Sequence, residues 1–137
     1  MTDHDEEQVV LAVLQTLLDA IANRDQVAMH AVLVPEGGAG RGRGQADGHR
    51  DDRVLHSLLR ELPARMPGGT TTLEERIFDP LVRVDDDIAM IWAPYDFFID
   101  GKPHHWGTNI ISLLKRDGHW RITGVTDNGR SGRRPTT

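Results

Sequence analysis

Two Asp-Gly steps, Asp100-Gly101 and Asp117-Gly118, divide the C-terminal half of the chain into apolar runs. Asp-Gly between apolar runs is a strong signal for a β-hairpin, because a type I′ turn needs a positive φ at both central residues. The runs are Leu81–Val84, Ile88–Ile99, Pro103–Leu114 and Trp120–Thr126, and the acidic corner Asp85–Asp87 separates the first two. The sequence therefore predicts a long antiparallel meander.

Three helices are expected before the meander, because apolar residues recur there at helical spacing after possible caps. The first should run to about Ala22, the second over Gln26–Leu33, and the third from Asp51 or Asp52 to Leu62. Between the last two, Glu36–Gly48 contains the glycine- and arginine-rich stretch 37–44. We interpret it as a loop, or at most a poor edge strand, because so many glycines weaken any regular element.

Helices followed by strands are typical of an α+β fold with its helices on one face of an antiparallel sheet. A first long strand is expected over Thr70–Val84, with Pro80 at a bulge or an edge. Pro94 cannot donate to a strand ladder, so it predicts a bulge that bends Ile88–Ile99. The expected fold is a cone, in which a strongly curved antiparallel sheet of four to five strands wraps around a long N-terminal helix plus two shorter helices. Residues 1–130 should form one domain and residues 131–137 a flexible tail.

Composition excludes several classes of protein. The 137 residues suffice for one domain, and the absence of cysteine excludes disulfides, thiolate metal sites and cysteine nucleophiles. The net charge of −5 argues against nucleic-acid binding, and no apolar run approaches the roughly 20 residues that span a membrane. The acidic start is unlike a secretory signal, so a cytoplasmic location is expected. The scattered histidines and the glycine stretch fit neither a metal site nor a cofactor motif.

Part of the meander resembles the NTF2-like superfamily, and more specifically its SnoaL-like or lumazine-binding branch. The resemblance rests on Ile91–Lys102, His105, Gly107 and the hairpin Leu114–Ile122, which contains the pattern Leu-x-x-x-Gly-x-Trp-x-Ile. It implies a cone-shaped α+β fold, frequent homodimers, and either a small-molecule pocket or an enzyme site such as that of ketosteroid isomerase, scytalone dehydratase or polyketide cyclases. The branch would have a small residue where this chain has Trp106, a side chain large enough to plug the pocket.

The first Asp-Gly turn sets which side chains share a face. A two-residue loop places Asp96 opposite His105, and opposed residues have Cβ atoms about 4.5–5.5 Å apart. We then expect Asp96 to orient His105 and raise its pKa, as for a general base or acid. A three-residue loop would instead pair Phe97 with His105 and separate the two groups. The expected ligand-binding residues are Tyr95, Phe98, Asn109, Ile111 and Trp120.

The opposite face of the meander is also apolar, and a sheet with two apolar faces indicates a partner. A two-fold, sheet-to-sheet homodimer is the simplest arrangement. Its expected contact residues are Tyr95, Phe97, Trp106 and Ile110.

Three functions follow from these patterns. The leading interpretation is a homodimer that binds a small molecule in a mostly apolar cone, without assigned chemistry. One alternative is a SnoaL-type isomerase, dehydratase or cyclase, with His105 as general base, Asp96 as its orienting group, and Tyr95 or Asn109 as a polarising donor. The other alternative is a non-catalytic, partner-binding dimer with a filled cone. Asp127 and Asn128, at the end of the last expected strand, can reach the mouth of the cone, but a surface turn is the favoured interpretation.

Overall fold

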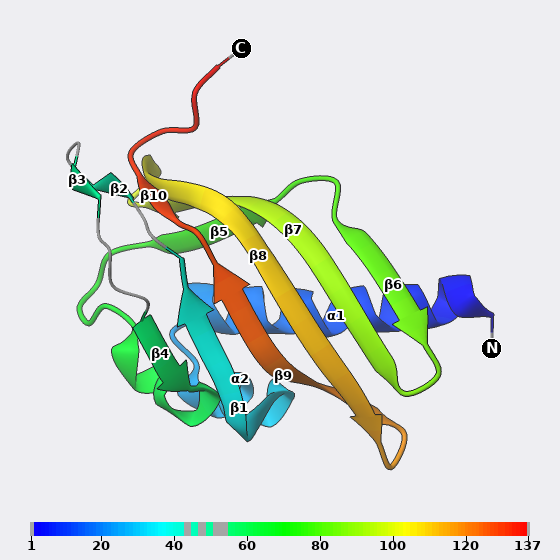
Figure 1. The fold of residues 1–137 in the computed structure, drawn as a ribbon. Helices are drawn as coiled ribbons and strands as arrows, with labels where there is room; N and C mark the ends of the chain where they lie inside the picture. The colour runs from blue at the N-terminus through cyan, green and yellow to red at the C-terminus, as the bar shows by residue number, and fades with distance from the viewer. Residues whose placement is uncertain (1, 43–44, 47–48, 51–54, 137) are drawn as a thin grey trace.

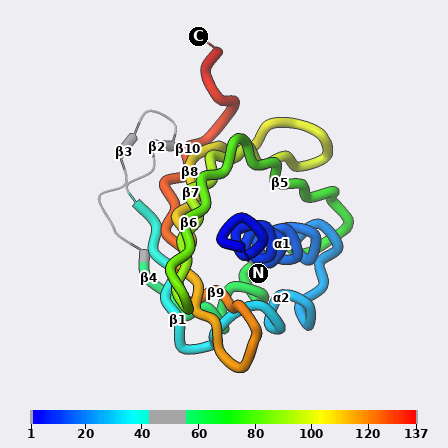
Figure 2. The backbone as a smooth tube through the Cα atoms, turned by 90° about the vertical axis from the view of Figure 1, so that its right-hand side faces the viewer, coloured from blue at the N-terminus to red at the C-terminus, as the bar shows by residue number. Residues whose placement is uncertain are grey.

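The computed structural model of the chain describes residues 2–42, 45–46, 49–50 and 55–136. Figure 1 shows a curved, eight-stranded sheet with helix α1 (Asp3–Ala22) behind its concave side. Figure 2 looks along α1 and shows the chain curling around it, with the second helix α2 (Gln26–Val32) below. The sheet is curved but not closed, so the expected α+β cone is confirmed.

Helix α1 begins and ends close to the residues expected from the sequence. The Thr2 side chain accepts a hydrogen bond from the Asp5 backbone N–H, and the Asp5 carboxylate accepts one from the Thr2 backbone N–H, which forms a capping box. One turn later, the Glu6 carboxylate accepts hydrogen bonds of 2.8 Å from both Lys115 Nζ and Trp120 Nε1. These contacts fix the start of the helix to the sheet, and its buried face is Val10, Leu14, Leu17, Leu18 and Ala20.

The strands of the large sheet follow the order β4-β1-β9-β8-β7-β5, with β6 also paired to β7 and β10 to β8. Their bounds are β1 (Leu33–Arg41), β4 (Leu55–Leu58), β5 (Leu73–Ile77), β6 (Leu81–Asp85), β7 (Ile88–Ile99), β8 (Lys102–Arg116), β9 (His119–Asp127) and β10 (Arg130–Ser131). The short strands β2 (Gln45–Ala46) and β3 (His49–Arg50) pair with each other. The antiparallel run from β6 to β9 confirms the predicted meander.

The glycine-rich segment is a strand and not a loop in its described part. Strand β1 lies between β4 and β9 and runs parallel to β9, with a shift in register between Leu33 and Gly38. A Cβ atom on Gly37 would collide with the Thr123 carbonyl oxygen and with the Leu59 side chain. Glycine is required there because the two strands approach so closely, and the interpretation as a loop or edge strand was therefore wrong.

The single strand expected over Thr70–Val84 is two strands, β5 and β6, which both pair with β7. Asp79 adopts a positive φ of 41° at the break, immediately before Pro80. Pro94 pairs with Thr108 without any shift in register, so the bulge expected at Pro94 is absent. Pro94 is tolerated because it faces the break between β5 and β6, where its missing N–H has no partner strand.

Two other segments differ from expectation. The described part of the expected third helix is β4 followed by two short 3-10 turns, Leu59–Glu61 and Pro63–Arg65, while its expected start lies outside the described residues. Leu55–Leu58 pairs with β1 instead of turning into a helix. The expected boundary between the domain and the flexible tail, at residues 130 and 131, falls within β10, which lies antiparallel to β8.

Candidate functional site

A bulge at His104 determines which side chains face the interior of the cone. The Asp100-Gly101 turn has two residues, both with positive φ, and places Phe98 opposite Pro103, as a two-residue loop requires. The register then shifts by one residue, so that Phe97 lies opposite His105 and Asp96 lies opposite Trp106. The expected Asp96–His105 pair was therefore wrong. The observed pairing of Phe97 with His105 is the one expected for a three-residue loop, but a bulge after a two-residue loop produces it.

The bulge places Asp96 on the outer face of the sheet. Its carboxylate accepts a hydrogen bond of 3.0 Å from Arg134 Nε, an ion pair that holds the segment after β10 against the sheet. Phe98 also lies on this face, with the Arg76 guanidinium 4.5 Å from its ring centroid. Phe98 therefore does not line the cone, contrary to expectation.

Tyr95 and Phe97 point into the cone and are buried, so their expected place on the outer dimer face was wrong. His105 packs between them and stacks on the Phe97 ring at a centroid distance of 4.7 Å. Burial, together with the nearby His104 and Arg41, lowers the pKa of His105 to about 4. The imidazole is therefore neutral near pH 7, which is the opposite of the raised pKa expected from an Asp96 partner.

The cone holds a cavity of about 320 Å³ between α1 and the inner face of the sheet. Its wall is mostly apolar, with side chains from α1, α2, the 3-10 turns and the strands, among them Leu17, Ile21, Met66, Phe97 and Val125. Of the residues expected to bind a ligand, Asn109 and Ile111 line this cavity.

The two tryptophans named from the sequence lie elsewhere. Trp106 pairs with Asp96 on the outer face, between the guanidinium groups of Arg130 and Arg134, so it does not plug the cavity. Trp120 is buried at the start of α1, where its indole N–H is bound to Glu6, and it does not line the cavity.

Glu75 is the central polar group of the cavity wall. It projects from β5 with its Oε2 atom 3.2 Å from Asn109 Nδ2, which donates the hydrogen bond. Burial, reinforced by the negative charge of nearby Asp127, raises the pKa of the Glu75 carboxyl to about 7. The side chain can therefore hold or release a proton near neutral pH.

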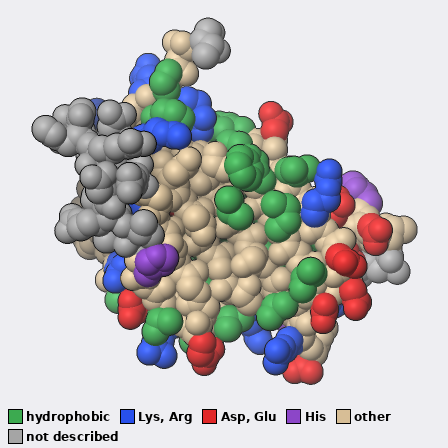
Figure 3. Space-filling view, viewed as in Figure 1, with side chains coloured by type: hydrophobic (Ala, Val, Ile, Leu, Met, Phe, Trp, Pro, Cys, Tyr) green, Lys and Arg blue, Asp and Glu red, His purple; other side chains and the backbone are tan. Residues whose placement is uncertain are grey.

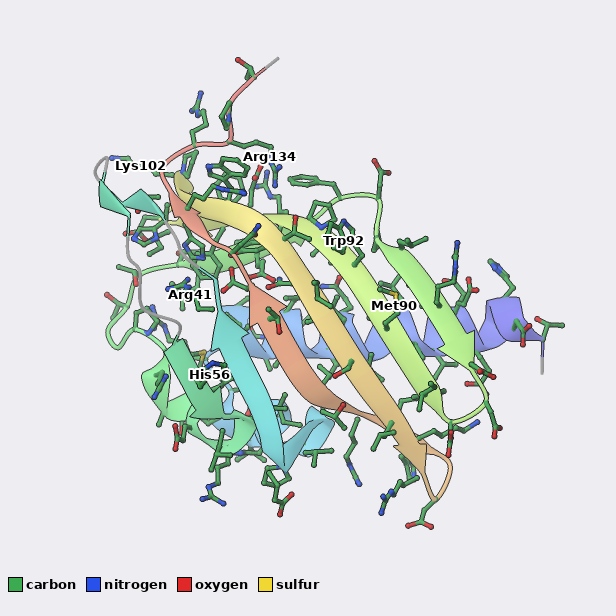
Figure 4. All side chains as sticks on the ribbon, in the orientation of Figure 1. Arg41, His56, Met90, Trp92, Lys102 and Arg134 are labelled. Atoms are coloured by element: carbon green, nitrogen blue, oxygen red, sulfur yellow. The ribbon has the colours of Figure 1, made fainter. Side chains whose placement is uncertain are left out.

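Beside Glu75, a hydrogen-bonded cluster centres on Asp127 at the end of β9. Asp127 Oδ1 accepts hydrogen bonds of 2.6 Å from both the Tyr95 hydroxyl and the Gly129 backbone N–H. Its Oδ2 lies 3.5 Å from Nε of Arg41, which comes from the upper end of β1 and also lines the cavity (Figure 4). Burial and the adjacent Asp127 charge raise the pKa of Tyr95, so its hydroxyl stays protonated.

Sequence reasoning missed the most informative polar residues. Glu75 lies two residues from both Leu73 and Ile77 along β5, and this spacing already places its carboxyl on the same, inward face of the strand. A surface turn is favoured for Asp127 from the sequence, with the cone mouth as the alternative, and in the structure Asp127 is largely covered by Tyr95 and Arg41. Its contact with Arg41 depends on β1 lying beside β9, which local patterns do not reveal.

Neither a metal cluster nor a membrane-spanning helix is found in the described part of the chain. No three His, Cys, Asp or Glu side chains among the described residues gather closely enough to hold a metal ion. No helix within those residues is long and apolar enough to cross a membrane.

Solved structures with the same architecture identify the fold. No protein-family model and no curated protein sequence matches the chain. An NTF2-like protein of unknown function from Silicibacter pomeroyi superposes with a TM-score of 0.72 at 20% identity, covering 95% of this chain and 100% of that chain. An NTF2-like protein from Cytophaga hutchinsonii gives 0.71 at 16% identity, with 93% and 98% covered. A protein of unknown function from Mycobacterium tuberculosis gives 0.69 at 19% identity, with 92% and 77% covered. The chain therefore has the NTF2-like fold.

Proposed function

We propose that the protein binds a small, mostly apolar molecule in the cone cavity. The observation that carries this proposal is a cavity of about 320 Å³ whose apolar wall is interrupted by the polar residues Arg41, Arg65, Glu75 and Asn109. Ligand sites are typically cavities of roughly 300–1,000 Å³ with an apolar lining and a few convergent polar groups. The volume lies at the low end of that range, which favours a compact ligand.

The polar groups indicate how such a ligand would be oriented. The Asn109 side-chain amide donates a hydrogen bond to one carboxylate oxygen of Glu75. The other oxygen has no hydrogen-bond partner among the described residues. The apolar body would pack against Leu17 and Ile21 of α1, while a hydroxyl, carbonyl or carboxyl group would meet Glu75 and Arg41. Leaving the buried carboxyl unpaired would cost free energy, so ligands with a hydrogen-bonding group should bind more tightly than pure hydrocarbons.

Binding is tested with 2-naphthol, an aromatic alcohol, in solution NMR. Val125 lines the cavity, so Val125→Phe should fill part of it and weaken binding about tenfold or more, since about 1.4 kcal/mol corresponds to tenfold in affinity. The neighbouring Thr126 is exposed on the other face, which makes Thr126→Phe the matched control. Loss of affinity in both variants, or no shift of the Asn109 side-chain amide on titration, would contradict a ligand site in the cone.

Proton transfer is the second candidate function, with Glu75 and not His105 as the catalytic residue. A carboxyl with a pKa of about 7 is suited to general acid–base catalysis near neutral pH, whereas the pKa of His105 is lowered to about 4 and Asp96 does not orient it. The reaction class would be an isomerisation or dehydration that starts by removing a proton next to a carbonyl.

Deuterium exchange separates proton transfer from binding alone. In D₂O, the wild-type protein should accelerate exchange of the protons next to the carbonyl of 1-tetralone, and Glu75→Gln should abolish the acceleration while still binding 2-naphthol. His105→Gln should retain it. If the wild-type protein binds 1-tetralone but the ketone exchanges only at the uncatalysed rate, proton transfer is excluded for that ketone and binding is left as the function.

A homodimer through the outer face of the sheet remains part of the proposal, with corrected contact residues. Leu81, Trp92 and Ile110 form a continuous row across β6, β7 and β8, because each lies opposite the next. All three side chains are more than 40% exposed, and Figure 3 shows hydrophobic side chains gathered over these strands. Trp106 lies on the same face, but Arg130 and Arg134 cover its ring.

Sedimentation tests the dimer. The wild-type protein should sediment as a dimer at micromolar concentration and Ile110→Glu as a monomer. Thr16→Glu, at an exposed position of α1 on the other side of the sheet, should remain dimeric. A wild-type monomer would contradict the proposal. The cytoplasmic location expected from the sequence stays a prediction.

A further inference from the structure

A second hollow, outside the cone, lies where the β8–β9 hairpin meets the end of α2 and the start of β1. It has a volume of about 610 Å³. Since the cone cavity is lined by Arg41 at the other end of β1, the two sites are separate. The floor of this groove is apolar and includes Leu33, Pro35 and Leu114. Its polar rim is almost entirely basic and consists of His30, Arg116, His119 and Arg121, with Glu36 as the one acidic lining residue.

The hairpin register places the basic side chains on one face. Arg116 lies opposite His119 and Leu114 lies opposite Arg121, so all four residues share the outer face of the hairpin. Trp120 alternates with them and is buried on the inner face. Arg116 and Arg121 are therefore diagonal neighbours, whose backbones lie about 7–8 Å apart.

This concentration of positive charge is not neutralised within the described part of the chain. The described ion pairs of the sheet involve Arg41, Arg76, Lys115 and Arg134, and none includes Arg116 or Arg121. Like charges on one face of a strand pair repel each other, and the rest of the chain is acidic, with a net charge of −5. A local basic groove on an acidic protein favours an anion at this position and not a general attraction for polyanions.

We propose that this groove binds a small amphiphilic anion, in which a carboxylate or phosphate group is joined to a short apolar body. Two guanidinium groups at the rim can bind the oxygens of either anion, because arginine matches both geometries with paired N–H donors. The apolar body lies on Val34, Pro35 and Leu114, where it removes apolar surface from water. The proposal does not depend on the function of the cone cavity.

The experiment titrates ¹⁵N-labelled full-length protein with four probes: hexanoate, hexyl phosphate, hexanol and inorganic phosphate. Hexanoate or hexyl phosphate should shift the backbone amides of Arg116, His119 and Arg121 saturably, and the tighter of the two identifies the anionic group. Hexanol and inorganic phosphate should each bind at least about tenfold more weakly, because each lacks one half of the recognised chemistry. Added NaCl should weaken binding of the amphiphilic anions.

Variants locate the binding to the groove. The double variant Arg116→Gln/Arg121→Gln should reduce affinity for the better anion by about tenfold or more, through loss of two exposed charge interactions. Arg83→Gln removes an exposed arginine from β6 in the same sheet and should leave the affinity unchanged. The cavity-filling variant Val125→Phe should also leave it unchanged, which separates this site from the cone.

Any one of four results would overturn the proposal. The hairpin amides could fail to shift with either amphiphilic anion, hexanol could bind as tightly as hexanoate, or the double variant could retain the wild-type affinity. Equal affinity for inorganic phosphate and hexyl phosphate would overturn the role of the apolar floor.

Discussion

Replacing Glu75 with glutamine should make the stability of the protein less sensitive to pH. Burial raises the pKa of this carboxyl to about 7, compared with 4.5 for an unperturbed glutamate. Between these two pH values the folded protein holds a proton that the unfolded chain has released. The contribution of this carboxyl to the free energy of unfolding therefore falls by about 1.4 kcal/mol for each pH unit as the pH rises. Over the whole window the loss is roughly 3 kcal/mol.

Glutamine cannot ionise, yet its side-chain oxygen can still accept the hydrogen bond from Asn109. Glu75→Gln should therefore match the wild type near pH 4.5 and be more stable by roughly 3 kcal/mol near pH 8.5. Urea denaturation of both proteins at several pH values measures this, and the difference cancels the titration of all the groups that they share.

The matched control is Glu74→Gln on the same strand. The hydrogen bond from Arg76 lowers the pKa of Glu74, so this control should gain no stability as the pH rises. If the stability difference between Glu75→Gln and the wild type does not change with pH, the carboxyl is not held in a desolvated wall, and its assignment to acid–base chemistry fails as well.

Two further outcomes depend on local packing. Gly107→Ala should destabilise the protein by about 1–3 kcal/mol in urea denaturation, because its Cβ would lie 2.9 Å from Asn128 Oδ1, which is held by the Thr108 N–H. Gly68→Ala, whose Cβ would meet no atom within 4 Å, is the control, and an equal effect of both substitutions would refute the steric explanation. NMR titration of His105 should give a midpoint near pH 4, and a midpoint at or above the ordinary 6.5 would show that the ring is not buried as described.

Local signals predicted the C-terminal half of the fold closely. The two Asp-Gly turns have Asp and Gly at positive φ, as a type I′ turn requires, and the long strands that flank them pair as expected. The first helix was equally predictable, because its cap and its apolar spacing agree. These features depend on residues near one another in the sequence, where propensity and turn chemistry dominate.

The predictions that were wrong concern features that depend on contacts between residues far apart in the sequence. The glycines of β1 weaken a strand on local grounds, but Gly37 allows β1 to approach Thr123 of β9, a contact that spans most of the chain. No turn residue or proline at His104 indicates the bulge in the sequence. The bulge is stabilised in part by a distant residue, because the Gly132 N–H donates to the His104 carbonyl. The predicted Asp96–His105 pair was wrong for the same reason, because the bulge decides which residue of β8 lies opposite Asp96.

The extra residue at His104 also affects how this hairpin is compared with those of other NTF2-like chains. Successive strand residues alternate between two faces. If β8 is aligned by counting from the turn, each inward residue of this chain beyond His104 is therefore matched to an outward residue of a chain without the bulge. Correspondences should therefore be counted outward from Asn109 and Ile111, where the pairing with β7 is regular. Counted from the loop along β8, Trp106, which faces outward here, would be matched to a residue that faces the interior in a chain without the bulge.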